Sequence, residues 1–160
     1  MLMLSLLCTP VYIVTGFSYA MRFRRPLGIY AFLYALLHLV NFLWIDYGFN
    51  FSILSEDLFE KRYAIAGMVS FLLLLPLAVT SFSKLRKKLG TMWRKLHFLV
   101  YPAGIAAVIH YIWQTKIGIL VPVIYGVILL LLLIIRIPPI RNFIKTHFRW
   151  IALQQSIDNP

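Results

Sequence analysis

The chain has 160 residues, of which 61% are hydrophobic and 13% charged, and 16 Lys and Arg against 5 Asp and Glu give a net charge of +11. A soluble domain of this length cannot bury so much apolar surface, so the composition indicates a membrane protein. The single cysteine, Cys8, excludes a disulfide framework and a cysteine-based metal knuckle. The basic residues form short clusters between apolar runs, which is typical of loops that face anionic lipid headgroups and not of a surface that binds nucleic acid.

Five hydrophobic segments follow one another, each close to the roughly 20 residues with which an α-helix crosses a bilayer. We expect them at about 1–20, 26–46, 63–83, 96–114 and 118–136. The first segment lacks the basic start and small-residue cleavage site of a signal peptide, which favours a transmembrane helix. The predicted fold is therefore an all-α, polytopic transmembrane helix bundle, with one domain over 1–150 and a short polar tail over 151–160.

Charged residues predict the orientation of the bundle, because Lys and Arg are enriched in cytoplasmic loops. Three connections are basic and are assigned to the inner side: Arg22, Arg24 and Arg25 after the first segment; Lys84, Arg86, Lys87, Lys88, Arg94 and Lys95 after the third; and Arg136, Arg141, Lys145 and Arg149 after the fifth. The outer connections hold Asp46, Glu56, Asp57 and Glu60 beside Lys61 and Arg62, and Lys116 alone. The second and fourth segments therefore run in the same direction, from inside to outside.

This shared direction makes the depths of the histidines comparable. At 1.5 Å per residue, His38 lies about 18 Å above the inner start of the second segment, and His110 about 21 Å above that of the fourth. His97 lies near the inner end of the fourth segment, about 20 Å below His110. His147 follows the last segment, beside Lys145 and Arg149.

Two apolar helices that present histidines at one depth suggest a b-type haem with an imidazole on each side of the iron. The aromatic residues nearby that would enclose it are Phe32, Tyr34, Phe42 and Tyr111. Zinc is disfavoured, because the segments lack carboxylates and further thiols.

Other interpretations of the histidines stay open. An isolated intramembrane histidine is often a hydrogen-bonded packing residue, although ionisable residues in a membrane are usually functional. His97 could instead lie at the headgroup boundary, and His147 is expected to be solvated. On an ideal helix His97 and His110 are about 140° apart, so they do not share a face unless a kink at Pro102 changes the phase.

A resemblance to a known family rests on an ordered set of residues within "VTSFSKLRKKLGTMWRKLHFLVYPAGIAAVIHYIW" and "RRPLGIYAFLYALLHL". The first stretch contributes Thr80, Ser81, Leu89, Gly90, Trp93, Leu96, His97, Val100, Tyr101, His110, Tyr111 and Trp113, and the second Arg24, Arg25, Leu27, Gly28, Leu37, His38 and Leu39. From about Leu7 to Phe143 the chain resembles the ferric-reductase-like transmembrane domain in its bacterial MsrQ form, the haem-binding membrane subunit of a periplasmic methionine sulfoxide reductase system.

The resemblance implies a b-type cytochrome of the bacterial inner membrane that makes and breaks no substrate bonds itself. It would pass electrons from a flavin such as FMN, a cytoplasmic flavin reductase or the quinone pool to a periplasmic molybdopterin enzyme. The resemblance also implies that His38, His97 and His110 bind haem iron. His38 and His110 form the outer pair, whereas the second segment offers Arg24 and Arg25, and no histidine, opposite His97.

Family members usually carry a further helix and outer loop before the first segment, and here the apolar run starts at Met1. We therefore expect a shortened form or a fragment. Three alternatives stay open: a ferric or cupric reductase of the same fold, a quinone-linked cytochrome, and a haem-free scaffold or small transporter in which the histidines only pack.

Overall fold

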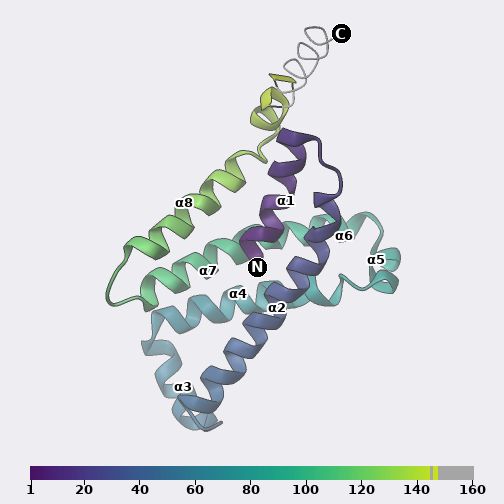
Figure 1. Ribbon diagram of the computed structural model, residues 1–160. Helices are drawn as coiled ribbons and strands as arrows, with labels where there is room; N and C mark the ends of the chain where they lie inside the picture. Colours follow the sequence, from purple (N-terminus) through teal and green to yellow (C-terminus); the bar gives the residue numbers. More distant parts are fainter. Residues whose placement is uncertain (145, 148–160) are drawn as a thin grey trace, which may run out of the picture.

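The computed structural model describes residues 1–144 and 146–147, and every regular element in this part of the chain is helical, as predicted (Figure 1). The elements are α1 (Leu2–Thr15), α2 (Ala20–Ile45), α3 (Phe51–Glu60), α4 (Arg62–Val79), α5 (Ser83–Leu89), α6 (Thr91–Leu96), the 3₁₀ turn η1 (His97–Leu99), α7 (Val100–Gln114) and α8 (Leu120–Ile134). A short helix, Pro138–Ile144, follows α8. The predicted polar tail, 151–160, lies outside the described residues.

Three helical stretches are long and apolar enough to cross a membrane: Ala20–Ile45, Arg62–Val79 and Thr91–Gln114. A fourth candidate consists of α8 together with Pro138–Ile144, which are bent by 81° relative to each other. The first predicted segment forms α1, which is apolar but only 14 residues long. The chain is a membrane protein whose described residues provide three to four candidate spans.

The ends of the helices differ from the predicted ends for local reasons. α1 stops at Thr15, because Gly16 takes the left-handed conformation, with φ 71°, that commonly ends a helix. α2 starts at Ala20, ahead of the predicted start at 26, and Pro26 lies within it. This early start is possible because arginine favours the helical conformation and proline is tolerated in membrane helices. The short helices α3 and α5 lie in connections for which no helix was predicted.

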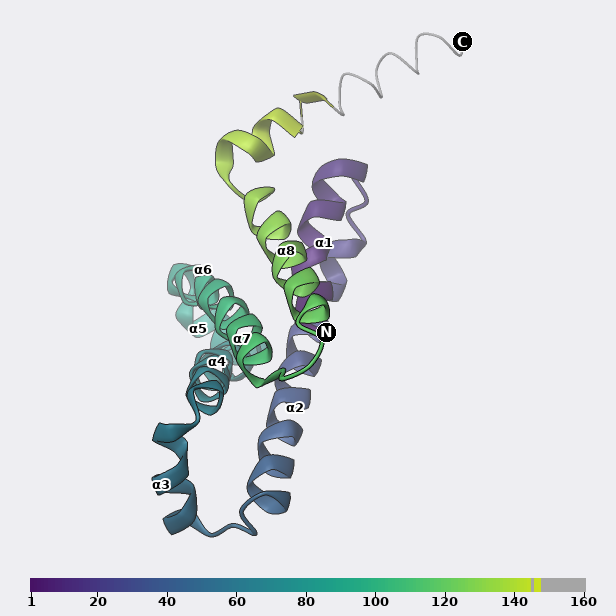
Figure 2. The same ribbon diagram turned by 90° about the vertical axis from the view of Figure 1, so that its left-hand side faces the viewer.

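The helices pack in two groups, α1 with α2 and α8, and α4 with α7, which meet where α8 contacts α7 and α2 contacts α4 (Figure 2). α4 lies along α7, and the buried Ser70 hydroxyl of α4 donates to the Ala103 carbonyl of α7 at 2.9 Å. α8 lies beside α7 and α1, where Leu6, Leu129 and Leu132 form the buried core. α7, which carries His110, therefore packs against α4 on one side and α8 on another.

A proline in α1 allows a polar contact that joins α1, α7 and the end of α8. Pro10 has no N–H, so the carbonyl of Leu6, four residues earlier, lacks its usual helical partner. Arg136, just after α8, donates to this carbonyl and also, at 3.2 Å, to the Tyr101 hydroxyl of α7. One guanidinium thus links α1, α7 and the end of α8.

The connections divide between two ends of the molecule (Figure 1). The α1–α2 connection, α5 and the end of α8 lie toward one end, and α3 and the α7–α8 turn lie toward the other. The first set carries the basic clusters and the second carries the acidic residues. We use inner and outer below for these two ends.

Candidate functional site

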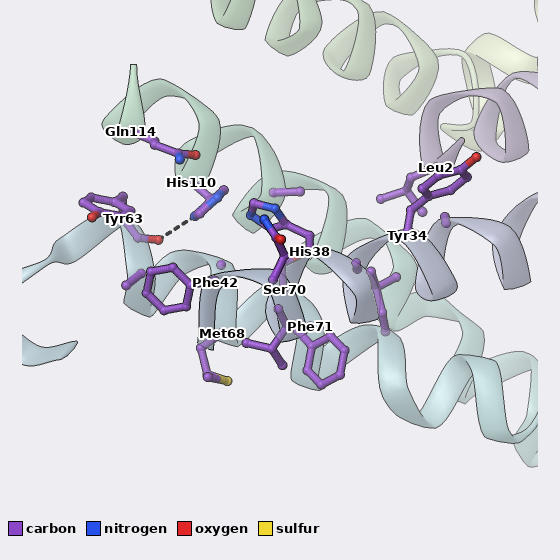
Figure 3. A pocket seen from close by; sticks show the side chains of 18 of the residues that line it. Leu2, Tyr34, His38, Phe42, Tyr63, Met68, Ser70, Phe71, His110 and Gln114 are labelled. Atoms are coloured by element: carbon purple, nitrogen blue, oxygen red, sulfur yellow. Dashed lines mark hydrogen bonds between the residues drawn. The ribbon is translucent and has the colours of Figure 1, made fainter. Parts of the chain in front are cut away.

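Two histidines from different helices meet in a cavity between α2, α4 and α7, which we call the outer cavity (Figure 3). His38 comes from α2 and His110 from α7, and their ring centres are 6.0 Å apart, with ring planes at 76°. The bond from an imidazole nitrogen to a metal ion is about 2 Å, so two imidazoles on opposite sides of one ion have ring centres about 6 Å apart. The separation therefore suits a single metal ion between the rings.

A backbone hydrogen bond fixes the orientation of one of these rings. Nδ1 of His110 lies 2.7 Å from the carbonyl oxygen of Tyr63 in the first turn of α4, to which it donates as the N–H tautomer. Metal-binding histidines commonly make this contact with the nitrogen that is not bound to the metal. The Nε2 lone pair of His110 is then available as a ligand.

The walls of the outer cavity suit a flat apolar group. The cavity has a volume of about 550 Å³, within the range of about 300–1,000 Å³ of ligand pockets in proteins. Its lining is mostly apolar and includes Leu39, Phe71 and Ala107. Besides the histidines and tyrosines, its polar side chains are those of Asn41, Asp46, Ser70 and Gln114. The residues present therefore fit a haem held by two imidazoles, and the same walls would exclude water from it.

The predicted aromatic enclosure is found in part. Tyr34 and Phe42 line the outer cavity. Phe32 stacks on Phe71, which lines the cavity, with ring centres 5.5 Å apart. Tyr111 instead contacts Tyr125 of α8, 6.0 Å away. Because Tyr111 follows His110 directly, it projects about 100° around the helix from it.

His97 lies apart from the other two histidines. Its Nδ1 is 3.0 Å from the carbonyl oxygen of Trp93, and its ring centre is 4.0 Å from that of Trp93. It lines a separate inner cavity of about 790 Å³. His97 is the first residue of the 3₁₀ turn η1, His97–Leu99, which directly precedes α7. This turn departs from the uniform α-helical phase from which the 140° separation was calculated.

The inner cavity is strongly basic. Arg24, Arg25, Arg86, Arg94 and Lys95 line it, and its lining contains no carboxylate. Within the described part of the chain, the acidic residues all lie between Asp46 and Glu60, at the outer end. A lining with several cationic side chains and no carboxylate favours an anionic ligand.

The fourth histidine has no place in either cavity. His147 is exposed, and its ring stacks on Phe143 with centres 6.3 Å apart. Among the described residues, no three His, Cys, Asp or Glu side chains gather as a protein-only metal site would require. Haem iron needs only two protein ligands, because the macrocycle supplies the others.

The sequence pattern gave no indication of two residues of α4 that contact His110. One is Tyr63, which acts through its backbone carbonyl, and the other is Gly67, which lies directly against the ring. A backbone oxygen has no signature in the sequence, and a glycine in an apolar segment is common in membrane helices.

Comparison with protein families gives one match. The family described as "Ferric reductase like transmembrane component" matches residues 1–108, which include His38 and His97. No solved structure has a significant match to the chain.

Curated relatives carry the description "Protein-methionine-sulfoxide reductase heme-binding subunit MsrQ". The protein of Xanthomonas campestris pv. campestris (strain 8004) is 41% identical over 133 residues, which cover 83% of this chain and 61% of the relative. The protein of Rhodospirillum rubrum is 39% identical over 139 residues, which cover 86% of this chain and 67% of the relative. The chain thus spans about three fifths of the length of the Xanthomonas relative. It belongs to the ferric reductase-like transmembrane family, in the branch of the MsrQ haem-binding subunits.

Proposed function

We propose that the chain is an electron-transfer subunit of the membrane that holds a b-type haem between His38 and His110. The observation that carries this proposal is the 6.0 Å separation of the two ring centres inside an apolar cavity. A haem with two imidazole ligands supplies one-electron chemistry and leaves no open position for oxygen. The name of the relatives, a haem-binding subunit of protein-methionine-sulfoxide reductase, supports the same assignment.

The residues around the site have separate roles in this proposal. His38 and His110 would hold the haem iron, His110 through Nε2, because the Tyr63 carbonyl accepts the Nδ1 proton of His110. The apolar lining from α2, α4 and α7 keeps water away, which affects the reduction potential. Asn41 and Gln114 are polar groups of the lining that can meet the propionates of the macrocycle.

The route of electrons through the chain forms the next part of the proposal. Electrons enter at the basic inner end in the bacterial inner membrane, from a flavin reductase or the quinone pool, and leave from the outer cavity. The acceptor is a periplasmic molybdopterin-dependent reductase of oxidised methionine residues in proteins. The order of the two cavities, from His97 at the inner end to the histidine pair, supports this direction.

The inner cavity is the candidate site for a second redox group. His97 offers one imidazole there, and Arg24, Arg25 and Arg94 offer charge to a phosphate or carboxylate. FMN, through its phosphate, and a second haem, through its propionates, both fit this description. Release of flavin on denaturation would identify the first, and two haems per chain the second.

A haem content assay tests the proposal. The purified chain in detergent is expected to show a Soret band and, after dithionite, the α-band of a low-spin b-type haem. His38→Ala and His110→Ala should each lose the outer haem, whereas His147→Ala, the matched control, should keep it. A chain without a Soret band, or variants that keep full haem content, would contradict the ligand assignment.

Three further measurements distinguish the proposal from its alternatives. Recovery of a molybdoenzyme in a pull-down favours the methionine sulfoxide system, whereas oxidation of the haem by ferric or cupric salts favours a metal reductase. Loss of haem reduction in quinone-depleted membranes identifies the quinone as donor.

A further inference from the structure

His110 contacts α4 more closely than any side chain at position 67 would allow. A Cβ atom built on Gly67 would lie 2.7 Å from Nδ1 of His110, 2.9 Å from Cε1 and 3.3 Å from Cγ. The first two distances are shorter than real Cβ contacts, so only the hydrogen of a glycine fits against the ring. Gly67 has no positive φ, which means that the requirement comes from space and not from the backbone conformation.

Two groups of α4 therefore fix one ring. The carbonyl of Tyr63 accepts the Nδ1 proton at 2.7 Å, and Gly67, four residues later on the same face, lets the Nδ1 edge of the ring lie close to the helix. If the ring moved away from α4 by a few tenths of an ångström, the hydrogen bond to Tyr63 would lengthen with it.

The other glycines of the membrane helices would leave more space for a Cβ than Gly67 does. A Cβ on Gly28 would meet the Ser5 hydroxyl at 3.7 Å, and one on Gly104 the Leu129 side chain at 3.4 Å. Gly126 faces Val108 at 3.3 Å. Gly67 differs from these three because its close neighbour is an imidazole that our proposed function places on iron.

We propose that Gly67 is a positioning residue for the haem ligand His110, and that α4, which contains no histidine, sets the orientation and basicity of that imidazole. The inference rests on the proposed function. A donated hydrogen bond from Nδ1 makes Nε2 a stronger donor and stabilises ferric over ferrous iron. Gly67 thereby keeps the midpoint potential of the outer haem low.

The first test compares Gly67→Ala with wild type in the haem-loaded chain. The added methyl group pushes the ring from the Tyr63 carbonyl, so we expect a midpoint potential more positive than that of wild type and a changed ferric EPR spectrum. Gly104→Ala is the matched control, since it adds the same methyl group to α7 at an ordinary 3.4 Å contact with Leu129, outside both cavities, and its potential should equal that of wild type. An unchanged potential and spectrum in Gly67→Ala would overturn the inference.

The second test keeps the inference falsifiable if Gly67→Ala folds poorly. It measures how far Gly67→Ala lowers the unfolding temperature in two backgrounds. One background is the wild type, and the other is His110→Ala. Once the imidazole is removed, the added methyl group no longer clashes with it, so the decrease in unfolding temperature caused by Gly67→Ala should largely disappear. An equal loss in both backgrounds would show that Gly67 serves only the packing of α4 against α7, and would overturn the inference.

The two proposals fail in different ways. If the wild-type chain binds no haem, the proposed function fails, while the double-mutant comparison still measures the contact between Gly67 and His110. If the wild type holds haem through two histidines and Gly67→Ala leaves its potential unchanged, only the positioning role of Gly67 fails.

Discussion

His38 and His110 are held in different ways, although both belong to the proposed haem site. His110 is half-buried and hydrogen-bonded to the Tyr63 carbonyl, so one nitrogen and the ring plane are fixed before any ligand binds. His38 is exposed toward the outer cavity, and its described ring contact is with His110. His110 therefore acts as the preorganised ligand, and His38 completes the pair from α2.

The pair was predicted from the depth of each histidine along its helix, and not from the faces on which the histidines lie. The rise per residue placed His38 and His110 at similar heights, and their rings lie 6.0 Å apart in the structure. Gly67 and the Tyr63 carbonyl could not be found in this way, because their contact depends on how α4 lies against α7. Ligation of iron by either histidine stays a prediction.

At the same scale, His97→Ala is expected to leave the outer haem intact. His97 lines the inner cavity, and neither His38 nor His110 does. The low-spin spectrum and the midpoint potential of the outer haem should match wild type in a redox titration, even if a second, inner group is lost. Loss of all haem from a variant that keeps its helical circular dichroism would contradict the separation of the two cavities.

Helix ends and connections depend on contacts that hydropathy does not reveal. The apolar runs predicted where helices occur, but α3 and α5 are too short and too polar to register as segments. The end of α1 at Gly16 and the early start of α2 follow from local backbone chemistry. The link from Arg136 to α1 could not be predicted either, because it joins residues 130 positions apart in the chain.

The contribution of Arg136 to the stability of the chain should depend on Pro10. Arg136→Met should lower the free energy of unfolding by about 1–2 kcal/mol, because the carbonyl of the buried Leu6 loses its partner. Pro10→Ala restores an N–H four residues after Leu6, so the same Arg136→Met change should cost less in that background. Thermal unfolding in detergent measures both costs. Equal costs in the two backgrounds would show that Arg136 stabilises the chain by another contact.

The whole molecule combines two cavities of different character along one bundle. The inner cavity is lined by five cationic side chains and His97, whereas the outer cavity is mostly apolar and contains the histidine pair. The described acidic residues lie at the outer end, from Asp46, which lines the outer cavity, to Glu60. This polarity suits entry of electrons from an anionic donor at one end and their exit at the other.

Composition and charge clusters were enough to predict the membrane class and the division of the loops, because both are properties of long stretches. The shape and contents of the cavities were not predictable, because they depend on the packing of α2, α4 and α7. The chain spans about three fifths of the length of its Xanthomonas relative, so the route of electrons belongs to the complete assembly and stays a proposal.

Low-temperature EPR of the oxidised, purified chain tests the central claim most directly, because it reports the ligands of ferric haem and the angle between them. With ring planes at 76°, His38 and His110 should give a low-spin signal of large anisotropy, typical of two nearly perpendicular imidazoles. The signal should be absent from both His38→Ala and His110→Ala. Absence of this large-anisotropy signal from the wild type, or its survival in either variant, would contradict the assignment.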